Sequence, residues 1–108
     1  MTYASEDEGD NLEFNVAVIS TVTIHLNKVG TNSATDIYPD TNNVRTARKF
    51  AILGDKSFHI LGLNNKTFTN PKTVILNTWH AEKRNVPVIS RITIRTTADD
   101  TNMKLRWF

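Results

Sequence analysis

A chain of 108 residues is long enough for one domain with a hydrophobic core and too short for two. It contains no cysteine, which excludes disulfides, thiolate nucleophiles and cysteine-ligated metal sites. The formal net charge is +2, but five of the 11 acidic residues lie within the first 13 positions. No apolar run has the length of a membrane-spanning helix, and the acidic start is unlike a signal peptide.

The first 12 residues predict an acidic arm, followed by a single domain over residues 13–108. The charged residues of the arm are Glu6, Asp7, Glu8 and Asp10. The arm is either a solvated terminus or a segment that docks on a basic face of its own or a neighbouring subunit. The rest of the chain carries the excess of Lys and Arg that such a face needs.

Apolar residues recur at every second position from Phe14 to Leu26, which predicts strand and not helix. The polar pair Ser20-Thr21 divides this stretch into two strands or marks a bend. Residues 27–44 are rich in Asn, Asp, Thr and Ser, and they predict a long loop with a short strand near Ile37-Tyr38.

The second half of the chain predicts several more short strands. Residues 48–53 and 57–61 flank a short turn with Gly54, which is typical of a hairpin. A second turn is expected at 62–65, and a polar loop at 81–85. Further strands are predicted at 73–79, 86–96 and 103–107. The fold class is therefore all-β: an antiparallel, jelly-roll-like β-sandwich of seven to eight short strands.

The last two strands are predicted to pair as a hairpin. Every register that turns both apolar sets to the core places like charges opposite each other on the outer face. The cations of this face are Arg91, Arg95, Lys104 and Arg106. They indicate an anionic partner: the acidic arm, an acidic neighbouring subunit or nucleic acid. Alternatively, the long side chains splay into water.

The chemistry of the remaining residues predicts no enzyme, cofactor or metal site. His25, His59 and His80 are scattered and lack metal-site spacing, and no nucleophile or phosphate-loop motif is present. Asp99-Asp100 is interpreted as a turn in which a carboxylate caps backbone N–H groups. Alternation places Trp107 in the core, and Trp107-Phe108 is also a candidate apolar anchor at a subunit contact.

The segment VISRITIRTTADDT at 88–101, followed by Met103-Lys104-Leu105, resembles the C-terminal strands of small β-sandwich structural proteins of tailed bacteriophage virions. The strand at 48–53 and its expected hairpin are similar in style. The resemblance extends over about half of the chain and not over the 27–44 loop. It implies a part in virion assembly, as a capsid decoration or as a collar, neck or tail accessory protein, and it transfers no catalytic residue.

We therefore expect a non-enzymatic virion protein, made in the host cytoplasm, that cements a repeated shell surface. Its expected partners are copies of itself, as a trimer or ring, and virion proteins such as the major capsid protein. The alternative is a small nucleic-acid- or carbohydrate-binding β-barrel, although the acidic arm disfavours a nucleic-acid partner. The predicted interface residues are Glu6, Asp7, Glu8, Asp10, Arg91, Arg95, Lys104, Arg106, Trp107 and Phe108.

Overall fold

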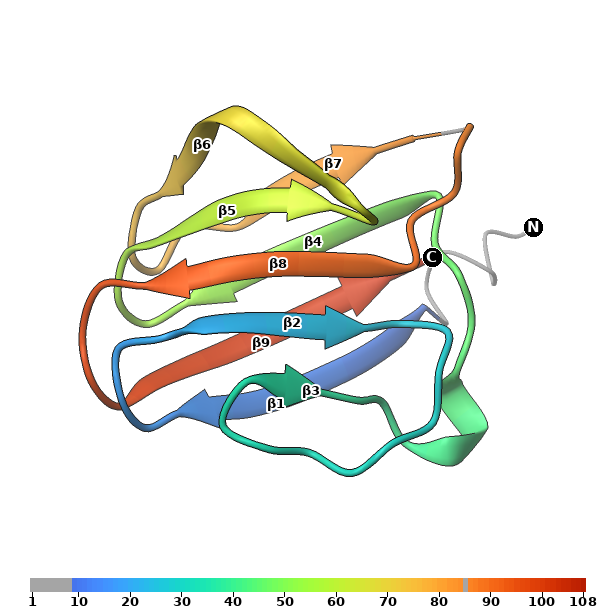
Figure 1. Cartoon of the computed structure of the whole chain (residues 1–108), viewed down its shortest axis with the longest axis horizontal. Coiled ribbons are helices and arrows are strands. Elements are labelled where there is room, and N and C mark those ends of the chain that lie inside the picture. Colours follow the sequence, from blue (N-terminus) through green and yellow to red (C-terminus); the bar gives the residue numbers. More distant parts are fainter. Residues whose placement is uncertain (1–8, 85) are drawn as a thin grey trace.

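The computed structural model describes residues 9–84 and 86–108, and there the chain forms two β-sheets packed face to face (Figure 1). The four-stranded sheet has the order β1-β9-β4-β7, with β1 at Asp10–Val16, β4 at Lys49–Gly54, β7 at His80–Lys83 and β9 at Thr101–Trp107. The five-stranded sheet has the order β3-β2-β8-β5-β6, with β2 at Thr21–His25, β3 at Asp36–Ile37, β5 at Phe58–Leu63, β6 at Lys66–Val74 and β8 at Arg91–Thr96.

The strand pairs are nested along the chain. β1 pairs with β9, β2 with β8, β4 with β7 and β5 with β6, all of them antiparallel. This is the pairing order of one long hairpin folded over into two sheets. The predicted all-β sandwich is confirmed. The described residues form nine strands instead of seven to eight, because β7 lies where a polar loop was predicted. The two-residue β3 pairs with β2 in parallel, so the sandwich is not purely antiparallel.

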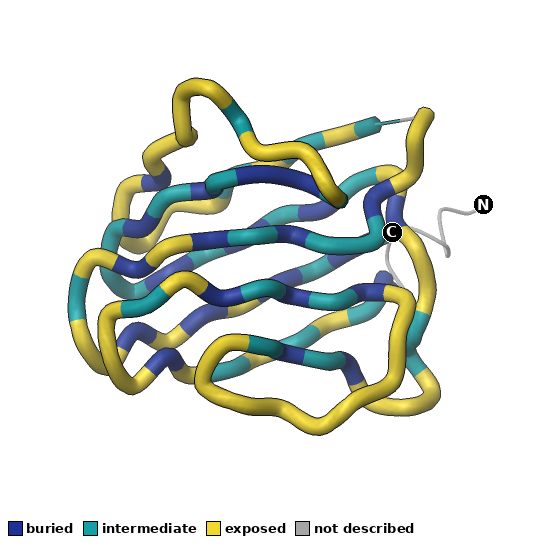
Figure 2. The backbone as a smooth tube through the Cα atoms, viewed as in Figure 1, coloured by how far each residue is buried: buried dark blue, intermediate teal, exposed yellow. Residues whose placement is uncertain are grey.

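Buried residues alternate with more exposed ones along the inner strands of both sheets (Figure 2), so every second side chain fills the core, as the period of two requires. The central strand β8 buries Ile92 and Ile94 and leaves Arg91 and Arg95 on the outer face. The largest fully buried side chain is Trp107, which packs in the same core cluster. The placement of Trp107 in the core by alternation is confirmed.

Both predicted hairpins are wrong. β4 and β5 lie in opposite sheets, and so do β8 and β9, so each connecting turn crosses from one sheet to the other. The alternating pattern shows only that each of two strands buries one apolar face in the core. Two strands can do so as hydrogen-bonded neighbours in one sheet or as members of opposite sheets that face each other, and the pattern is the same in both cases. The turn predicted at 62–65 does join paired strands, since Leu63 pairs with Lys66 across Asn64-Asn65.

Three predicted boundaries in the second half differ from the structure. β6 ends at Val74, and residues 75–79 form a turn in place of the strand predicted over 73–79. β7 occupies most of the polar loop predicted at 81–85, because an edge strand tolerates polar side chains on both faces. The strand predicted over 86–96 is regular only from Arg91, and Ile89 before it forms an isolated bridge with Ala47.

The N-terminal boundary also differs from the predicted arm. β1 begins at Asp10, so residues 10–12 belong to the sandwich and not to an arm. Glu6, Asp7 and Glu8 lie outside the described residues. The 27–44 loop contains β3, close to the strand predicted near Ile37-Tyr38, and a 3-10 turn at Thr41–Asn43.

Candidate interaction surfaces

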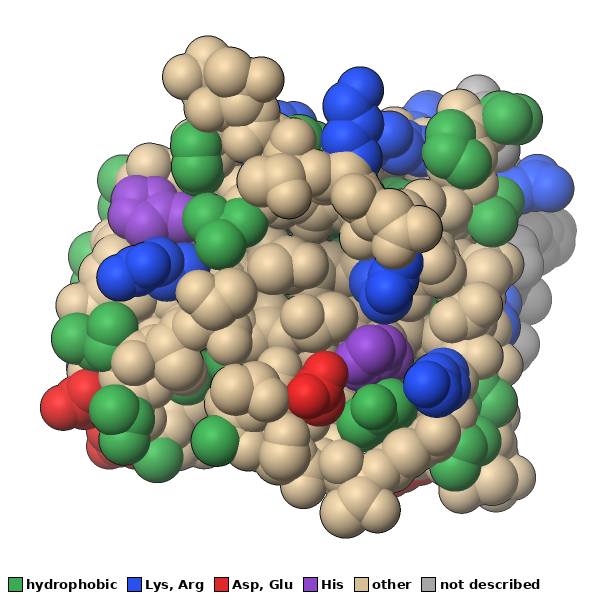
Figure 3. Space-filling model, in the orientation of Figure 1, with side chains coloured by type: hydrophobic (Ala, Val, Ile, Leu, Met, Phe, Trp, Pro, Cys, Tyr) green, Lys and Arg blue, Asp and Glu red, His purple; other side chains and the backbone are tan. Residues whose placement is uncertain are grey.

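The four cations predicted to share one face lie on two opposite faces. Arg91 and Arg95 belong to β8 and point outward from the five-stranded sheet, whose surface is mainly uncharged in Figure 3. Lys104 and Arg106 belong to β9 and point outward from the four-stranded sheet. The predicted four-cation face is therefore wrong, because it depended on the hairpin that does not form.

On the four-stranded sheet, the cations of β9 have favourable neighbours. Lys104 lies opposite Glu13 of β1, which is an opposite-charge pair in place of the predicted like-charge pair. The guanidinium of Arg106 lies 5.6 Å from the ring centroid of Phe108, and the ammonium of Lys49 lies 5.0 Å from it. Cations over an aromatic face are attracted by its negative quadrupole. This face therefore requires no anionic partner to offset charge repulsion between Lys104 and its neighbours.

Asp10 pairs with a residue that the sequence did not single out. Its carboxylate lies 2.6 Å from Nε of Arg45, and Nη2 of the same Arg45 donates to the carbonyl of Trp107 at 3.2 Å. Arg45 thus ties the start of β1 to the end of β9. Within the chain, Asp10 therefore pairs with Arg45 and not with the predicted C-terminal cations; its pairing with the cations of a neighbouring subunit stays a prediction.

The predicted Trp107-Phe108 anchor is divided between core and surface. Trp107 has no exposed surface, so it offers nothing to a partner of the folded chain. Phe108 is half-buried, and its backbone continues the ladder with β4, donating from its N–H to the carbonyl of Lys49 at 2.9 Å. Gly9 packs directly on the Phe108 ring, where an added Cβ would lie 2.3 Å from a ring carbon.

A different surface gathers exposed apolar side chains at one end of the sandwich. We call it the loop end: the connections at 17–20, 55–57, 75–79 and 97–100, which lie together at the left of Figure 1. Eight large apolar residues are exposed in the described part of the chain, and five of them lie here: Val18, Ile19, Ile75, Leu76 and Trp79. Hydrophobic and acidic side chains accordingly gather along the left edge of Figure 3.

Hydrogen bonds hold the 17–20 connection to the 97–100 connection. The carboxylate of Asp99 accepts from the N–H of Ile19 at 2.9 Å, and the N–H of Asp100 donates to the carbonyl of Ala17 at 3.0 Å. The Asp100 carboxylate also accepts from the side chain of Asn15 at 2.8 Å. The Asp99 carboxylate thus caps a backbone N–H, but that N–H belongs to the neighbouring connection and not to the turn before Thr101, where the cap was predicted.

The other two connections join the same network. The Lys56 ammonium donates to the carbonyls of Asp99 and Asp100 at 2.6 and 2.9 Å. Gly54 accepts from the N–H of Asn77 at 2.7 Å, which links 75–79 to the end of β4. The Asp55 carboxylate accepts two hydrogen bonds from Asn102, one from its backbone N–H and one from its side-chain amide. These bonds, the backbone one most strongly, hold the pKa of Asp55 below its usual range.

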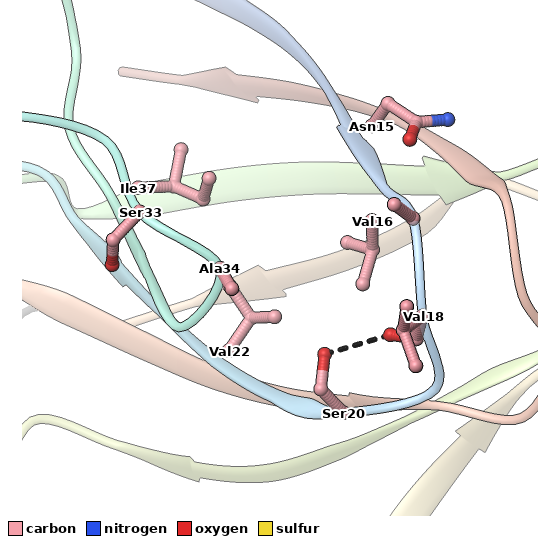
Figure 4. Close-up of a pocket in the computed structure, with 9 residues that line it drawn as sticks. Asn15, Val16, Val18, Ser20, Val22, Ser33, Ala34 and Ile37 are labelled. Atoms are coloured by element: carbon pink, nitrogen blue, oxygen red, sulfur yellow. Dashed lines mark hydrogen bonds between the residues drawn. The ribbon is translucent and has the colours of Figure 1, made fainter.

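A cavity of about 360 Å³ lies beside the loop end, between the end of β1 and the segment before β3 (Figure 4). Its lining is largely apolar and includes Val16, Val18, Val22, Ala34 and Ile37. It lies on the side of the sandwich where the edge strands of the two sheets, β1 and β3, face each other.

The outer face of the five-stranded sheet carries a separate set of polar contacts. The rings of His25 and Tyr38 stack with centroids 4.4 Å apart, and His25 Nε2 lies 2.9 Å from the carboxylate of Asp36. The His25 ring, followed by the Thr35 hydroxyl, lowers the pKa of Asp36. Among residues 9–84 and 86–108, no cluster of three or more metal-ligating side chains is present.

No known family model matches the chain, and no match is found among curated proteins or solved structures. In the described part of the chain, no helix has the length and hydropathy needed to cross a membrane.

Sequence reasoning missed the loop end because it assigned its apolar residues to strands. Ile75 and Leu76 were expected within the 73–79 strand, although two adjacent apolar residues followed by Asn77 interrupt strict alternation. Asn77 has a positive φ of 57°, a conformation that Asn tolerates better than most residues. That break in the pattern was the available signal.

Proposed function

We propose that this chain is a non-enzymatic structural protein of a tailed-phage virion, which docks through its loop end on a repeated protein surface. The exposed apolar side chains on mutually bonded connections carry the docking part of the proposal. The resemblance of residues 88–105 supports the virion part. Jelly-roll-like sandwiches occur in viral capsid and lectin domains, but a fold alone assigns no function.

The physical argument concerns the cost of exposing apolar surface. Grouped exposed apolar side chains on a small domain are a feature of interaction sites. Because hydrogen bonds already fix the connections, little conformational entropy is lost when a partner covers them. Trp79, which is 48% exposed, is the aromatic residue best placed to act as an anchor.

Capsid decoration is the position we favour, with the major capsid protein and further copies of this chain as partners. A collar, neck or tail accessory position would use the same surface. A carbohydrate- or nucleic-acid-binding role has less support, because the aromatic side chains that such a role would use, Tyr38 and Trp79, lie apart. Tyr38 follows β3 and stacks on His25, whereas Trp79 lies in the connection between β6 and β7 (Figure 1).

The proposal is tested by sedimentation with phage particles from the protein's source. We expect the native protein to co-sediment in a fixed number of copies per particle, and Leu76→Asp and Trp79→Ser to weaken this association about tenfold or more. Val86→Asp is the matched control, since Val86 is 89% exposed and lies outside the loop end. Absence of the protein from particles would overturn the virion role, and equal loss in all three variants would overturn the loop end as docking surface.

A further inference from the structure

We infer that the free edge of β1 binds β1 of a second copy, and that the four-stranded sheets of the two copies join into one continuous sheet. This inference rests on the proposed function in naming one of its partners, a second copy of this chain. It uses the free edge of β1, which adjoins the loop end at Val18 and lies apart from Leu76 and Trp79. The observations that carry it are the state of the four sheet edges, the direction of the β1 backbone groups and the adjoining apolar cavity.

Three of the four edge strands carry features that block pairing with another strand. β3 has only two residues. β6 contains Pro71, which has no N–H, and its pairing with β5 has a register shift. β7 has four residues, and its half-buried Glu82 forms an ion pair with Lys72 of β6. Short edges, proline, irregular pairing and inward charges are the usual protections of a sheet edge.

β1 is neither short nor irregular, and its one inward charge, Asp10, lies at its first residue and is paired with Arg45. The strand is seven residues long, contains no proline or lysine, and pairs with β9 in an unbroken register. Among the described residues, no backbone hydrogen bond reaches the edge of β1 that faces away from β9. A long, regular and unprotected edge strand is a template for another strand.

The ladder at the end of β9 shows which backbone groups of β1 are free. Phe108 and Lys49 exchange both backbone hydrogen bonds, so the N–H and C=O of Phe108 point toward β4. Direction alternates along a strand, so those of Trp107 point toward β1, and those of its register partner Asp10 point toward β9. The backbone N–H and C=O groups that point to the free edge of β1 therefore belong to every second residue after Asp10: Asn11, Glu13 and Asn15.

Three two-fold registers let these free groups pair in a second copy, centred on Leu12, Glu13 or Phe14. Centring on Glu13 places two carboxylates directly opposite each other, which is destabilising. Centring on Leu12 places the Asp10 carboxylate opposite the apolar Phe14. Centring on Phe14 pairs Glu13 with Asn15 and Leu12 with Val16, so within the strands no charges clash and apolar residues meet. Asp10 then lies beyond the end of the partner's β1, level with Val18. We assign the contact to this third register.

The cavity beside β1 supports the same register. Val16 lines that cavity together with Val18 and Ile37 (Figure 4). With the two-fold axis at Phe14, Leu12 of the second copy lies opposite Val16, at the edge of the cavity. The contact thus buries apolar side chains in addition to forming backbone hydrogen bonds. An isolated pair of strands in water has no such apolar burial and is only marginally stable.

A cysteine scan of this cysteine-free chain tests the register. Residues facing each other in a pair without mutual hydrogen bonds have Cα atoms about 4.5 Å apart, within the range of a disulfide. Under mild oxidation we expect Phe14→Cys to form a covalent dimer, and Leu12→Cys and Glu13→Cys to remain uncrosslinked. Crosslinking of Leu12→Cys or Glu13→Cys in place of Phe14→Cys would overturn the register.

The unmodified chain supplies the second measurement, since Phe14 packs partly against the core and its replacement weakens the fold. We expect light scattering to show a dimer, and the amides of Glu13 and Asn15 to exchange more slowly with deuterium as the protein concentration rises. A monomer whose Glu13 and Asn15 amides exchange at a concentration-independent rate would overturn the inference. Leu76→Asp should leave both readouts unchanged, so failure here and failure of the loop end are distinguishable.

Discussion

Two identical substitutions at differently placed isoleucines separate the residues that hold the fold from those available to a partner. Ile94 is fully buried at the centre of the five-stranded sheet, where it lies between Val22 of β2 and Ile60 of β5. Ile75 is 58% exposed in the loop end. If the loop end is a surface for binding and not part of the core, truncating Ile75 should cost far less stability than truncating Ile94.

The expected magnitudes follow from burial. Ile94→Ala removes buried carbon atoms worth about 0.8 kcal/mol each and leaves a cavity, so the loss of unfolding free energy should be about 3–4 kcal/mol. Ile75→Ala loses less than half of the transfer free energy and encloses no cavity, so its cost should be about 1 kcal/mol or less. A domain of ordinary stability has about 5–15 kcal/mol in total, so the first substitution removes a large share.

Urea unfolding followed by tryptophan fluorescence measures both values, because Trp107 is buried and becomes exposed on unfolding. With a slope of about 1–1.5 kcal/mol/M, Ile94→Ala should lower the urea midpoint by about 2–4 M and Ile75→Ala by about 1 M or less. Equal shifts for the two variants would refute the assignment of Ile75 to a surface that the fold does not need.

Three further predictions concern single contacts. Gly62→Ala should cost about 1–3 kcal/mol in the same assay, since its Cβ would lie 2.2 Å from the Lys66 carbonyl oxygen; an unchanged midpoint would contradict that close approach. Thr96→Val should cost about 1 kcal/mol by removing the hydroxyl that accepts from the N–H of Ser20 at 3.0 Å, and a variant as stable as the native protein would show that this bond is not needed. Asp36 has a lowered pKa, so its contribution to stability is complete above the unfolded value near 3.8 and is lost as the pH falls through the lower folded value. Asp36→Asn should therefore show a weaker pH dependence of unfolding below about 3.8, and superimposable profiles would argue against the His25 contact.

The fold class and the core could be predicted from the alternation of apolar and polar residues along the sequence. Most even positions from Phe14 to Leu26 do face the interior; the exception is Val18, which is exposed in the connection after β1. The polar Ser20-Thr21 pair does mark the passage between β1 and β2. The period of two depends on burial of one strand face, which is a local property of the chain. The same reasoning placed Trp107 in the core and identified the long segment before β4 as a loop.

Strand partners could not be predicted in this way. A sandwich offers each strand two ways to bury its apolar face, beside a neighbour or across from the other sheet, and the sequence pattern is the same for both. The turns around Gly54 and Asp99 therefore looked like hairpin turns although they cross between sheets. The predicted cation face was wrong because it required β8 and β9 to be neighbours in one sheet. The role of Arg45 was missed because its partners Asp10 and Trp107 lie far away in sequence.

Hydroxyl-radical footprinting of the protein, free and bound to phage particles, tests the loop end most directly as the docking surface. In the free protein Leu76, Trp79 and Val86 are all exposed and should all be oxidised. We predict that binding protects Leu76 and Trp79 and leaves Val86, outside the loop end, as reactive as before. Unchanged oxidation of Leu76 and Trp79 in the bound protein would contradict docking through the loop end.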